Sequence, residues 1–138
     1  MDPVVVSTKT ELDARRLPVT LKTTILDLIS ELRNYIFDSP EEKGDLFLVE
    51  FLFKKLSPEK IMQHIITHVL PWKKQIKNRD EKFFLENRKI FQGIPEDRIA
   101  HYGRVIVNEE RILKEDRESV WEYFDVIICL AESYKKVQ

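Results

Sequence analysis

Two histidines spaced four residues apart are the best candidates in this chain for binding a metal ion. His64 and His68 lie in the sequence His-Ile-Ile-Thr-His. On a helix this spacing projects both imidazoles from one side, as two ligands of a single zinc ion require. A third ligand, such as His101 or Glu50, would have to come from another helix, and Ile65 stands where a metalloprotease carries its general base. Histidines at the boundary of the core are the competing interpretation, and we expect no bound zinc and no other cofactor.

Residues 72–89 combine positive charge with aromatic side chains. Seven basic residues stand against three acidic ones, a local balance of +4: Lys73, Lys74, Lys77, Arg79, Lys82, Arg88 and Lys89. Trp72, Phe83 and Phe84 are interleaved with them, a composition typical of proteins that bind single-stranded nucleic acid by phosphate contact and base stacking. The same aromatic residues fit the spacing of a helical core. The segment therefore predicts either a nucleic-acid interface or a solvated basic face.

Catalytic groups are sparse. Glu122 and Asp125 could serve as an acid and base pair, but they are equally suited to be surface charges or partners of Lys and Arg. The single cysteine, Cys129, has no neighbouring basic residue to stabilise a thiolate, so we expect a small packing side chain there. The sequence contains no Gly-rich phosphate loop and no nucleophile elbow. These observations favour a non-catalytic function.

The C-terminal segment Asp116–Val137 is the element most able to organise the fold. Large apolar residues recur in it at steps of three and four, which forms one continuous stripe on a helix: Val120, Trp121, Phe124, Ile127, Ile128, Ala131 and Tyr134. The stripe is wider than a surface helix needs, so the sequence predicts a central helix.

Three further helices are expected between residues 19 and 70, where apolar residues keep the helical period. The first covers residues 19–37. In Ser39-Pro40-Glu41-Glu42, the serine, the proline and the second glutamate predict an N-cap, a first helical position and a capping box. This second helix runs to about Leu56, and Ser57-Pro58 starts the third.

Proline and glycine divide the rest of the chain. A proline inside a helix removes one backbone hydrogen bond and clashes with the preceding turn, so we expect a break at Leu70-Pro71. Asp80 is a candidate N-cap for a fourth helix that Gly93 would end, and Pro95 starts a fifth. Residues 1–18 contain β-branched valines and a proline, so we expect an extended or flexible arm there.

The resulting prediction is an all-α fold, a single bundle of five to seven helices around the C-terminal helix. With 138 residues and 43% apolar content, one domain over residues 19–138 is expected after the arm. The expected core comprises residues from several helices: Leu28, Leu52, Ile65, Phe84, Phe91, Trp121, Phe124 and Ile128.

Net charge and hydropathy limit the partners. A net charge of −1 gives no general attraction to nucleic acid or to an anionic membrane. We expect no transmembrane segment and no secretion signal, since every uncharged apolar run is far shorter than a span and no cationic leader is visible. A single cysteine suits a reducing compartment.

Several aromatic and charged pairs between residues 45 and 137 agree in order and spacing with a known group of proteins: His68-Val69-Leu70-Pro71-Trp72, Arg79-Asp80-Glu81, Phe83-Phe84, Asn87, Ile90-Phe91, Glu115-Asp116, Val120-Trp121, Tyr123-Phe124-Asp125 and Tyr134-Lys135-Lys136. In these features the chain resembles small all-helical proteins of unassigned function encoded by large cytoplasmic DNA viruses. The resemblance implies a viral origin and a location in the host cytoplasm or the virion, and it supplies no catalytic residues.

Together these observations predict a non-enzymatic protein that acts by binding another protein, viral or host, as a virion component or as a host-directed adaptor. Nucleic-acid binding through residues 72–89 is the alternative, and a metal-dependent enzyme is a third, more distant possibility.

Overall fold

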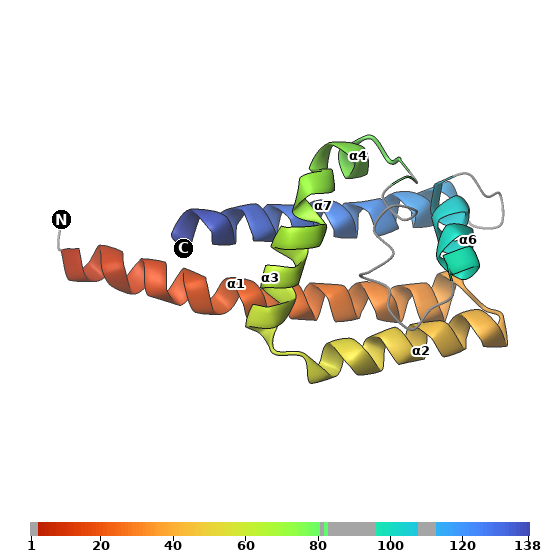
Figure 1. Cartoon of the computed structure of the whole chain (residues 1–138), viewed down its shortest axis with the longest axis horizontal. Helices are drawn as coiled ribbons and strands as arrows, with labels where there is room; N and C mark the ends of the chain where they lie inside the picture. The colour runs from red at the N-terminus through yellow and green to blue at the C-terminus, as the bar shows by residue number, and fades with distance from the viewer. Residues whose placement is uncertain (1–2, 81, 83–95, 108–112) are drawn as a thin grey trace.

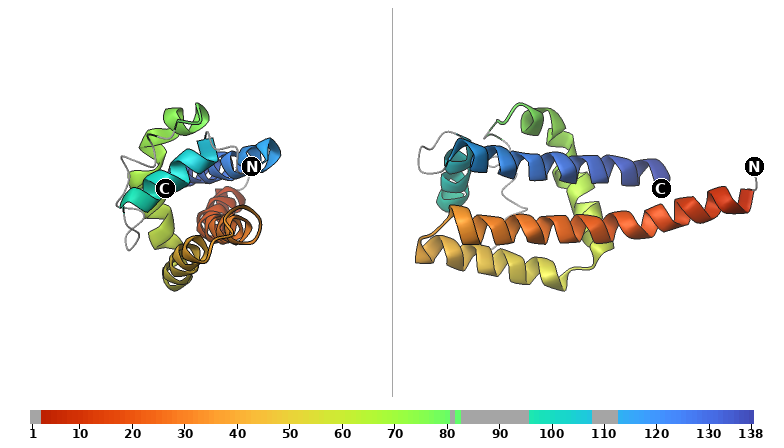
Figure 2. Two further views of the ribbon diagram at one scale, coloured as in Figure 1. Left: turned by 90° about the vertical axis from the view of Figure 1, so that its right-hand side faces the viewer. Right: turned by 180° about the vertical axis from the view of Figure 1, so that it is seen from behind.

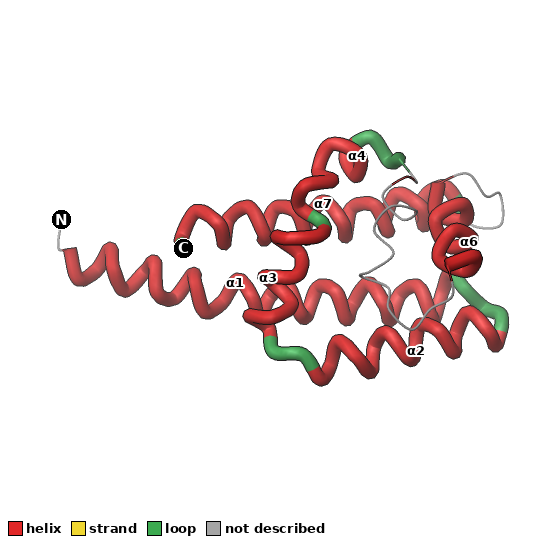
Figure 3. The backbone as a smooth tube through the Cα atoms, viewed as in Figure 1, coloured by secondary structure: helices red, strands yellow, loops and turns green. Residues whose placement is uncertain are grey.

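The computed structural model describes residues 3–80, 82, 96–107 and 113–138, and every regular element in these ranges is helical. The described ranges contain six α-helices and two short helical turns. In chain order the elements are α1 (Pro3–Glu31), the π-helical turn η1 (Leu32–Ile36), α2 (Pro40–Lys55), α3 (Pro58–His68), the 3₁₀ turn η2 (Leu70–Trp72), α4 (Lys73–Lys77), α6 (Glu96–Val107) and α7 (Lys114–Val137). Figure 3 shows this helical content along the backbone, and the prediction of an all-α fold is confirmed.

The two longest helices, α1 and α7, lie side by side and run in opposite directions (Figure 1). Helix α3 crosses both of them, and α7 also contacts α4 and α6. The predicted central role of the C-terminal helix is therefore confirmed. Helix α2 turns back along α1 and lies on the side of α1 away from α7 (Figure 2).

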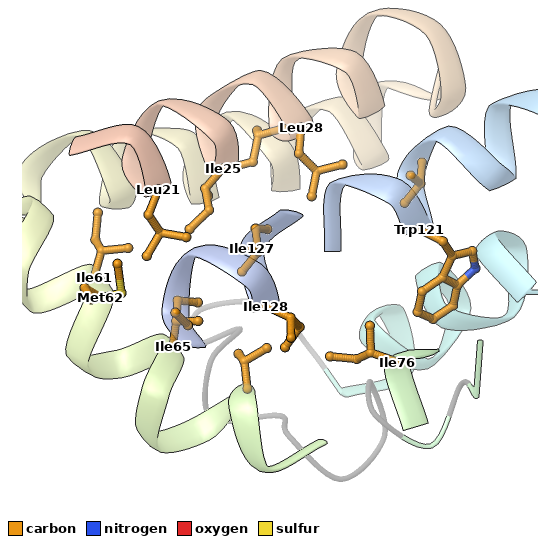
Figure 4. Packing of buried hydrophobic residues seen from close by; sticks show 14 of the residues in the cluster. Leu21, Ile25, Leu28, Ile61, Met62, Ile65, Ile76, Trp121, Ile127 and Ile128 are labelled. Atoms are coloured by element: carbon orange, nitrogen blue, oxygen red, sulfur yellow. The ribbon is translucent and has the colours of Figure 1, made fainter. Parts of the chain in front are cut away.

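The core fills the space between α1, α3 and α7. Figure 4 shows side chains of these three helices meeting one another, joined by Ile76 of α4: Leu21, Ile25 and Leu28 of α1, Ile61, Met62 and Ile65 of α3, and Trp121, Ile127 and Ile128 of α7. Each of these side chains is at most 6% exposed. Burial of this apolar surface is the main force that holds the helices together.

The expectation of an extended segment is wrong for residues 3–18, because α1 begins at Pro3 and continues through Pro18. A proline inside a helix costs about 3 kcal/mol. The ring of Pro18 is fully buried, and Leu17 packs against the core. Because burial of one such side chain contributes about 1.5 to 3 kcal/mol, tertiary packing offsets the local cost.

The predicted helix boundaries at Ser39, Ser57 and Pro71 are confirmed. The Ser39 hydroxyl accepts a hydrogen bond from the Glu42 amide, and the Glu42 carboxylate accepts one from the Ser39 amide, which completes the capping box. The Ser57 hydroxyl accepts a hydrogen bond from the Lys60 amide at the start of α3. Helix α3 ends at His68, and the chain passes Pro71 in η2.

The second half of the chain agrees with the prediction where it is described. The helix expected after Pro95 is α6, and the helix expected from Asp116 begins slightly earlier, at Lys114. The fourth helix expected after Asp80, with Phe84, Phe91 and its end at Gly93, lies outside the described residues.

The predicted core positions of Leu28, Ile65, Trp121 and Ile128 are confirmed, and Phe124 is partly buried against the same cluster. The prediction that Leu52 belongs to the core is wrong, because its side chain is 41% exposed. Helix α2 is apolar on two sides, and the bundle buries only one of them.

Candidate protein-interaction surface

Helix α2 has an inner and an outer apolar face. On the inner face Leu46 is 7% exposed, and Val49 and Phe53 pack against the core. The steps of three and four between these residues place them on one side of the helix. The remaining apolar side chains of α2, with the residue that follows it, form what we call the outer face: Phe47 (54% exposed), Leu48 (39%), Phe51 (54%), Leu52 (41%) and Leu56 (41%).

The position of α2 explains the exposure. This helix packs chiefly against α1 and η1, at the edge of the bundle (Figure 1). A helix held from one side buries a single stripe of side chains. The sequence carries a signal for the second face, since Leu46–Phe53 is interrupted by only one charged residue, Glu50, and is apolar nearly all round. The sequence analysis placed Leu52 in the core and so missed the surface.

Cations rim the outer face. The Arg33 guanidinium lies 4.4 Å from the centre of the Phe47 ring, and the Lys55 ammonium lies 4.2 Å from the centre of the Phe51 ring. Both distances allow cation–π attraction. Arg33 also pairs with Glu50, and its hydrogen bond lowers the pKa of that carboxyl group. The aromatic rings are thus held beside fixed charges while their outer edges face solvent.

The outer face is large enough to be functional. From the exposed fractions of its five side chains we estimate roughly 400 Å² of accessible apolar area, in the range where a patch on a folded protein marks an interaction site. Isolated apolar residues on a surface need no explanation, but a contiguous aromatic stripe on one helix does.

A polar cluster fixes the N-terminal end of α2 to α6. Arg98 pairs with Glu41 and Asp45, and the Tyr102 hydroxyl donates a hydrogen bond of 2.7 Å to Asp45. Partial burial is the main cause that raises the pKa of Tyr102, and this hydrogen bond raises it further. The His101 Nε2 atom lies 2.9 Å from a carboxylate oxygen of Glu42, which is 5% exposed.

Acidic residues of α7 pair with some of the basic residues in the segment 72–89. The Lys73 ammonium lies 2.9 Å from Glu132, and the Arg79 guanidinium binds both carboxylate oxygens of Asp125 at 2.9 and 2.8 Å. Trp72 is partly buried against the core. Lys74, Lys77 and Lys82 are exposed, whereas Phe83, Phe84, Arg88 and Lys89 lie outside the described residues.

A shallow groove of about 510 Å³ is lined by residues of α4, the turn after it and α7. Its lining mixes both signs of charge with Ile76 and Ile128. Lys73, Lys77 and Arg79 come from α4 and the turn after it, and Asp125, Cys129, Glu132, Ser133 and Lys136 come from α7. Cys129 is exposed, so the expectation of a packing side chain is wrong. It lies on the side of α7 that lines this groove rather than the side that meets α1.

The structure places Glu122 and Asp125 in different surroundings. Asp125 is engaged by Arg79 and lines the groove, whereas Glu122 is exposed and does not line it. Spacing by three residues places both carboxylates on one helix. The hydrogen bond to Asp125 and, to a lesser extent, the charge of Glu122 raise the pKa of Arg79.

The histidine pair on α3 lies close together, with the centres of the His64 and His68 rings 4.6 Å apart. Partial burial is the main cause that lowers the pKa of His64, and the charge of His68 lowers it further. The two proposed third ligands are elsewhere: His101 contacts Glu42 and Glu50 pairs with Arg33. Among the described residues, no group of three or more His, Cys, Asp or Glu side chains is arranged to hold a metal ion.

Within the same ranges, no helix has both the length and the apolar content that crossing a membrane requires. Comparison of the chain with protein-family models, with curated proteins and with solved structures gave no match.

Proposed function

We propose that this protein is non-enzymatic and acts by binding another protein through the outer face of α2. The observation that carries the proposal is the exposure of Phe47 and Phe51, each 54% accessible, on a helix whose other face is packed. Aromatic side chains and arginine are enriched at the centres of protein interfaces, because they bury a large area with little loss of conformational freedom.

The shape of the surface suggests how a partner is engaged. Phe47, Leu48, Phe51 and Leu52 follow steps of one, three and four along α2, so they form a ridge parallel to the helix axis. Such a ridge fits a complementary helix or a hydrophobic groove. The cluster that joins Glu41, Asp45 and Arg98 anchors the helix, so the ridge is preorganised and little entropy is lost on binding.

Nucleic-acid binding receives less support. Lys73 and Arg79 are already paired with carboxylates of α7, so their release for phosphate contact would leave Glu132 and Asp125 without these partners. The resemblance to proteins of large cytoplasmic DNA viruses adds the hypothesis that the partner is a viral or host protein, met in the host cytoplasm or in the virion.

Site-specific photo-cross-linking tests the proposal. A photoreactive phenylalanine analogue replaces Phe51 in one variant and Val126 of α7, which is 46% exposed, in a control variant. After expression in the host cell and illumination, we expect protein adducts from position 51 and few from position 126. A second substitution, Leu48→Asp, should remove the adducts at 51, because a carboxylate at the centre of an apolar interface is costly to bury.

Equal labelling at the two positions, or adducts at 51 that survive Leu48→Asp, would contradict a specific surface on α2. Adducts that join position 51 only to residues 83–95 of the same chain would show that the protein covers this face itself.

A further inference from the structure

We propose that the outer face of α2 pairs with the same face of a second copy of this chain, with the two α2 helices antiparallel. This inference rests on the proposed function, because it names the partner of that surface. It follows from the way charge and side-chain size are distributed along α2.

Of the charged residues of α2, the two that lie in line with Leu48 stand at opposite ends of the helix and have opposite signs. Glu41 lies in the first turn, where its side chain is 75% exposed even though it contacts Arg98, while Lys54 and Lys55 occupy the last turn. Residues 41, 48 and 55 are separated by seven positions and therefore lie on nearly the same side of the helix as the outer face. The apolar ridge is thus flanked by an acidic group at one end and a basic group at the other.

Antiparallel pairing matches these ends. A two-fold axis between Leu48 and Phe51 brings Leu48 of each copy onto Phe51 of the other, and Phe47 onto Leu52, so that each contact occurs twice. In this register Glu41 of one copy lies about 5 Å along the helix axis from Lys55 of the other, within reach of both side chains. A parallel pair would instead set Glu41 beside Glu41 and Lys55 beside Lys55.

Gly44 supplies the space that this register needs. It lies opposite Lys55 of the second copy, and a Cβ atom built on Gly44 would meet no other atom within 4 Å. The outer side of α2 is therefore open at this point. On dimerisation the long Lys55 side chain can leave the Phe51 ring of its own chain and pass over the glycine toward Glu41. The approach of two helices is closest where one of them carries a small residue.

The buried area sets the expected strength. About 400 Å² of apolar side chain per copy, with the polar rim added, gives an interface at the small end of those that form stable dimers. A dissociation constant on the order of 10 μM is therefore expected. A symmetric partner also accounts for a ridge that carries both signs of charge, since a partner of one sign would repel one of its ends.

Sedimentation equilibrium of the full chain tests the proposal. We expect the wild-type chain to be a dimer at about 100 μM and Phe51→Asp to be a monomer at the same concentration. Circular dichroism at about 1 μM, where both chains are monomers, should show closely similar melting curves for Phe51→Asp and the wild type, because the side chain is 54% exposed in the monomer. Val126→Asp on α7 is the matched control and should remain a dimer.

Charge reversal tests the orientation. Lys55→Glu should weaken the dimer by about 3- to 10-fold, since the altered contact occurs twice. Glu41→Lys should weaken it at least as much, because it also removes the contact with Arg98, and adding it to Lys55→Glu should recover part of the loss. In a parallel dimer neither single change would convert an attractive contact into a repulsive one. Dimerisation that ignores all three changes would overturn the antiparallel arrangement.

A wild-type chain that stays monomeric at about 100 μM would overturn the second copy as partner. If position 51 then cross-links to a different protein in cells, the proposed function survives without this inference. If the monomer instead binds mixed phosphatidylcholine and phosphatidylserine vesicles through Phe51, or if position 51 reaches only residues 83–95 of its own chain, both proposals fail.

Discussion

The guanidinium of Arg79 binds both carboxylate oxygens of Asp125, a residue 46 positions later in the chain, at 2.9 and 2.8 Å. Arg79 also has a φ of 57°, in the left-handed region that non-glycine residues rarely adopt. The turn after α4 is thus held against α7 by a side chain whose own backbone is strained. The guanidinium lies 5.4 Å from the centre of the buried Trp121 ring, which links the turn to the core.

Removing this contact should destabilise the protein only moderately. The Arg79 and Asp125 side chains are 38% and 48% exposed, so solvent screens the pair, and Arg79→Ala should lower the free energy of unfolding by about 1 kcal/mol. Arg79→Gly should cost less than Arg79→Ala, because glycine adopts a positive φ without strain. Urea denaturation monitored by circular dichroism measures the free energy of unfolding of both variants. A glycine variant less stable than the alanine variant would show that the backbone at residue 79 is not strained.

Trp121 should be essential for the fold. Its side chain is 3% exposed in the core, and truncation of a buried tryptophan to alanine costs about 3 to 5 kcal/mol. We expect Trp121→Ala to remove most of the stability of a domain of this size. The matched control is Val126→Ala on an exposed side of the same helix. Similar melting temperatures for the two variants would show that Trp121 does not anchor the core.

The stability should fall as His64 becomes protonated. Its pKa in the folded protein is lowered by partial burial and by His68, so the unfolded chain binds a proton more readily. The contribution of neutral His64 is complete above the unfolded value of 6.5 and is lost progressively as the pH falls below it. His64→Gln should flatten the pH dependence of unfolding in this range, and an unchanged profile in denaturant titrations would argue against the shift.

Nucleic-acid binding should be weak. Because Lys73 and Arg79 are paired with acidic residues of α7, we expect no binding tighter than roughly 10 μM at physiological salt. The measurement is a titration of labelled single- and double-stranded oligonucleotides at two salt concentrations. Reversal of Lys73, Lys74 and Lys77 to glutamate is the control. Sub-micromolar, salt-dependent binding that the reversal abolishes would make residues 72–89 the better functional surface.

Much of the fold could be predicted because its signals are local. The Ser39 capping box, the Ser57 N-cap and the break at Pro71 each depend on a few neighbouring residues and on the backbone groups they satisfy or remove. The wide apolar stripe of α7 likewise indicated its central position, since a helix that is apolar over half its circumference needs neighbours on several sides.

The candidate surface could not be predicted in the same way. Periodicity shows that α2 has apolar residues on more than one side, but it does not show which side meets α1. Leu46 and Leu52 belong to the same run of residues, and only the packing of α2 on α1 makes one buried and the other exposed. The same limit applies to Cys129, which is exposed and lines the groove between α4 and α7.

The sequence by itself determined the helical class, the main helix boundaries and the central helix, because hydrogen-bond caps, prolines and hydrophobic period act within one or two turns. Tertiary structure alone decided that α1 continues through Pro18, that Arg79 pairs with Asp125, and that the aromatic ridge of α2 faces solvent. These outcomes depend on distances between residues far apart in the chain. Burial energies there exceed local preferences of a few kcal/mol.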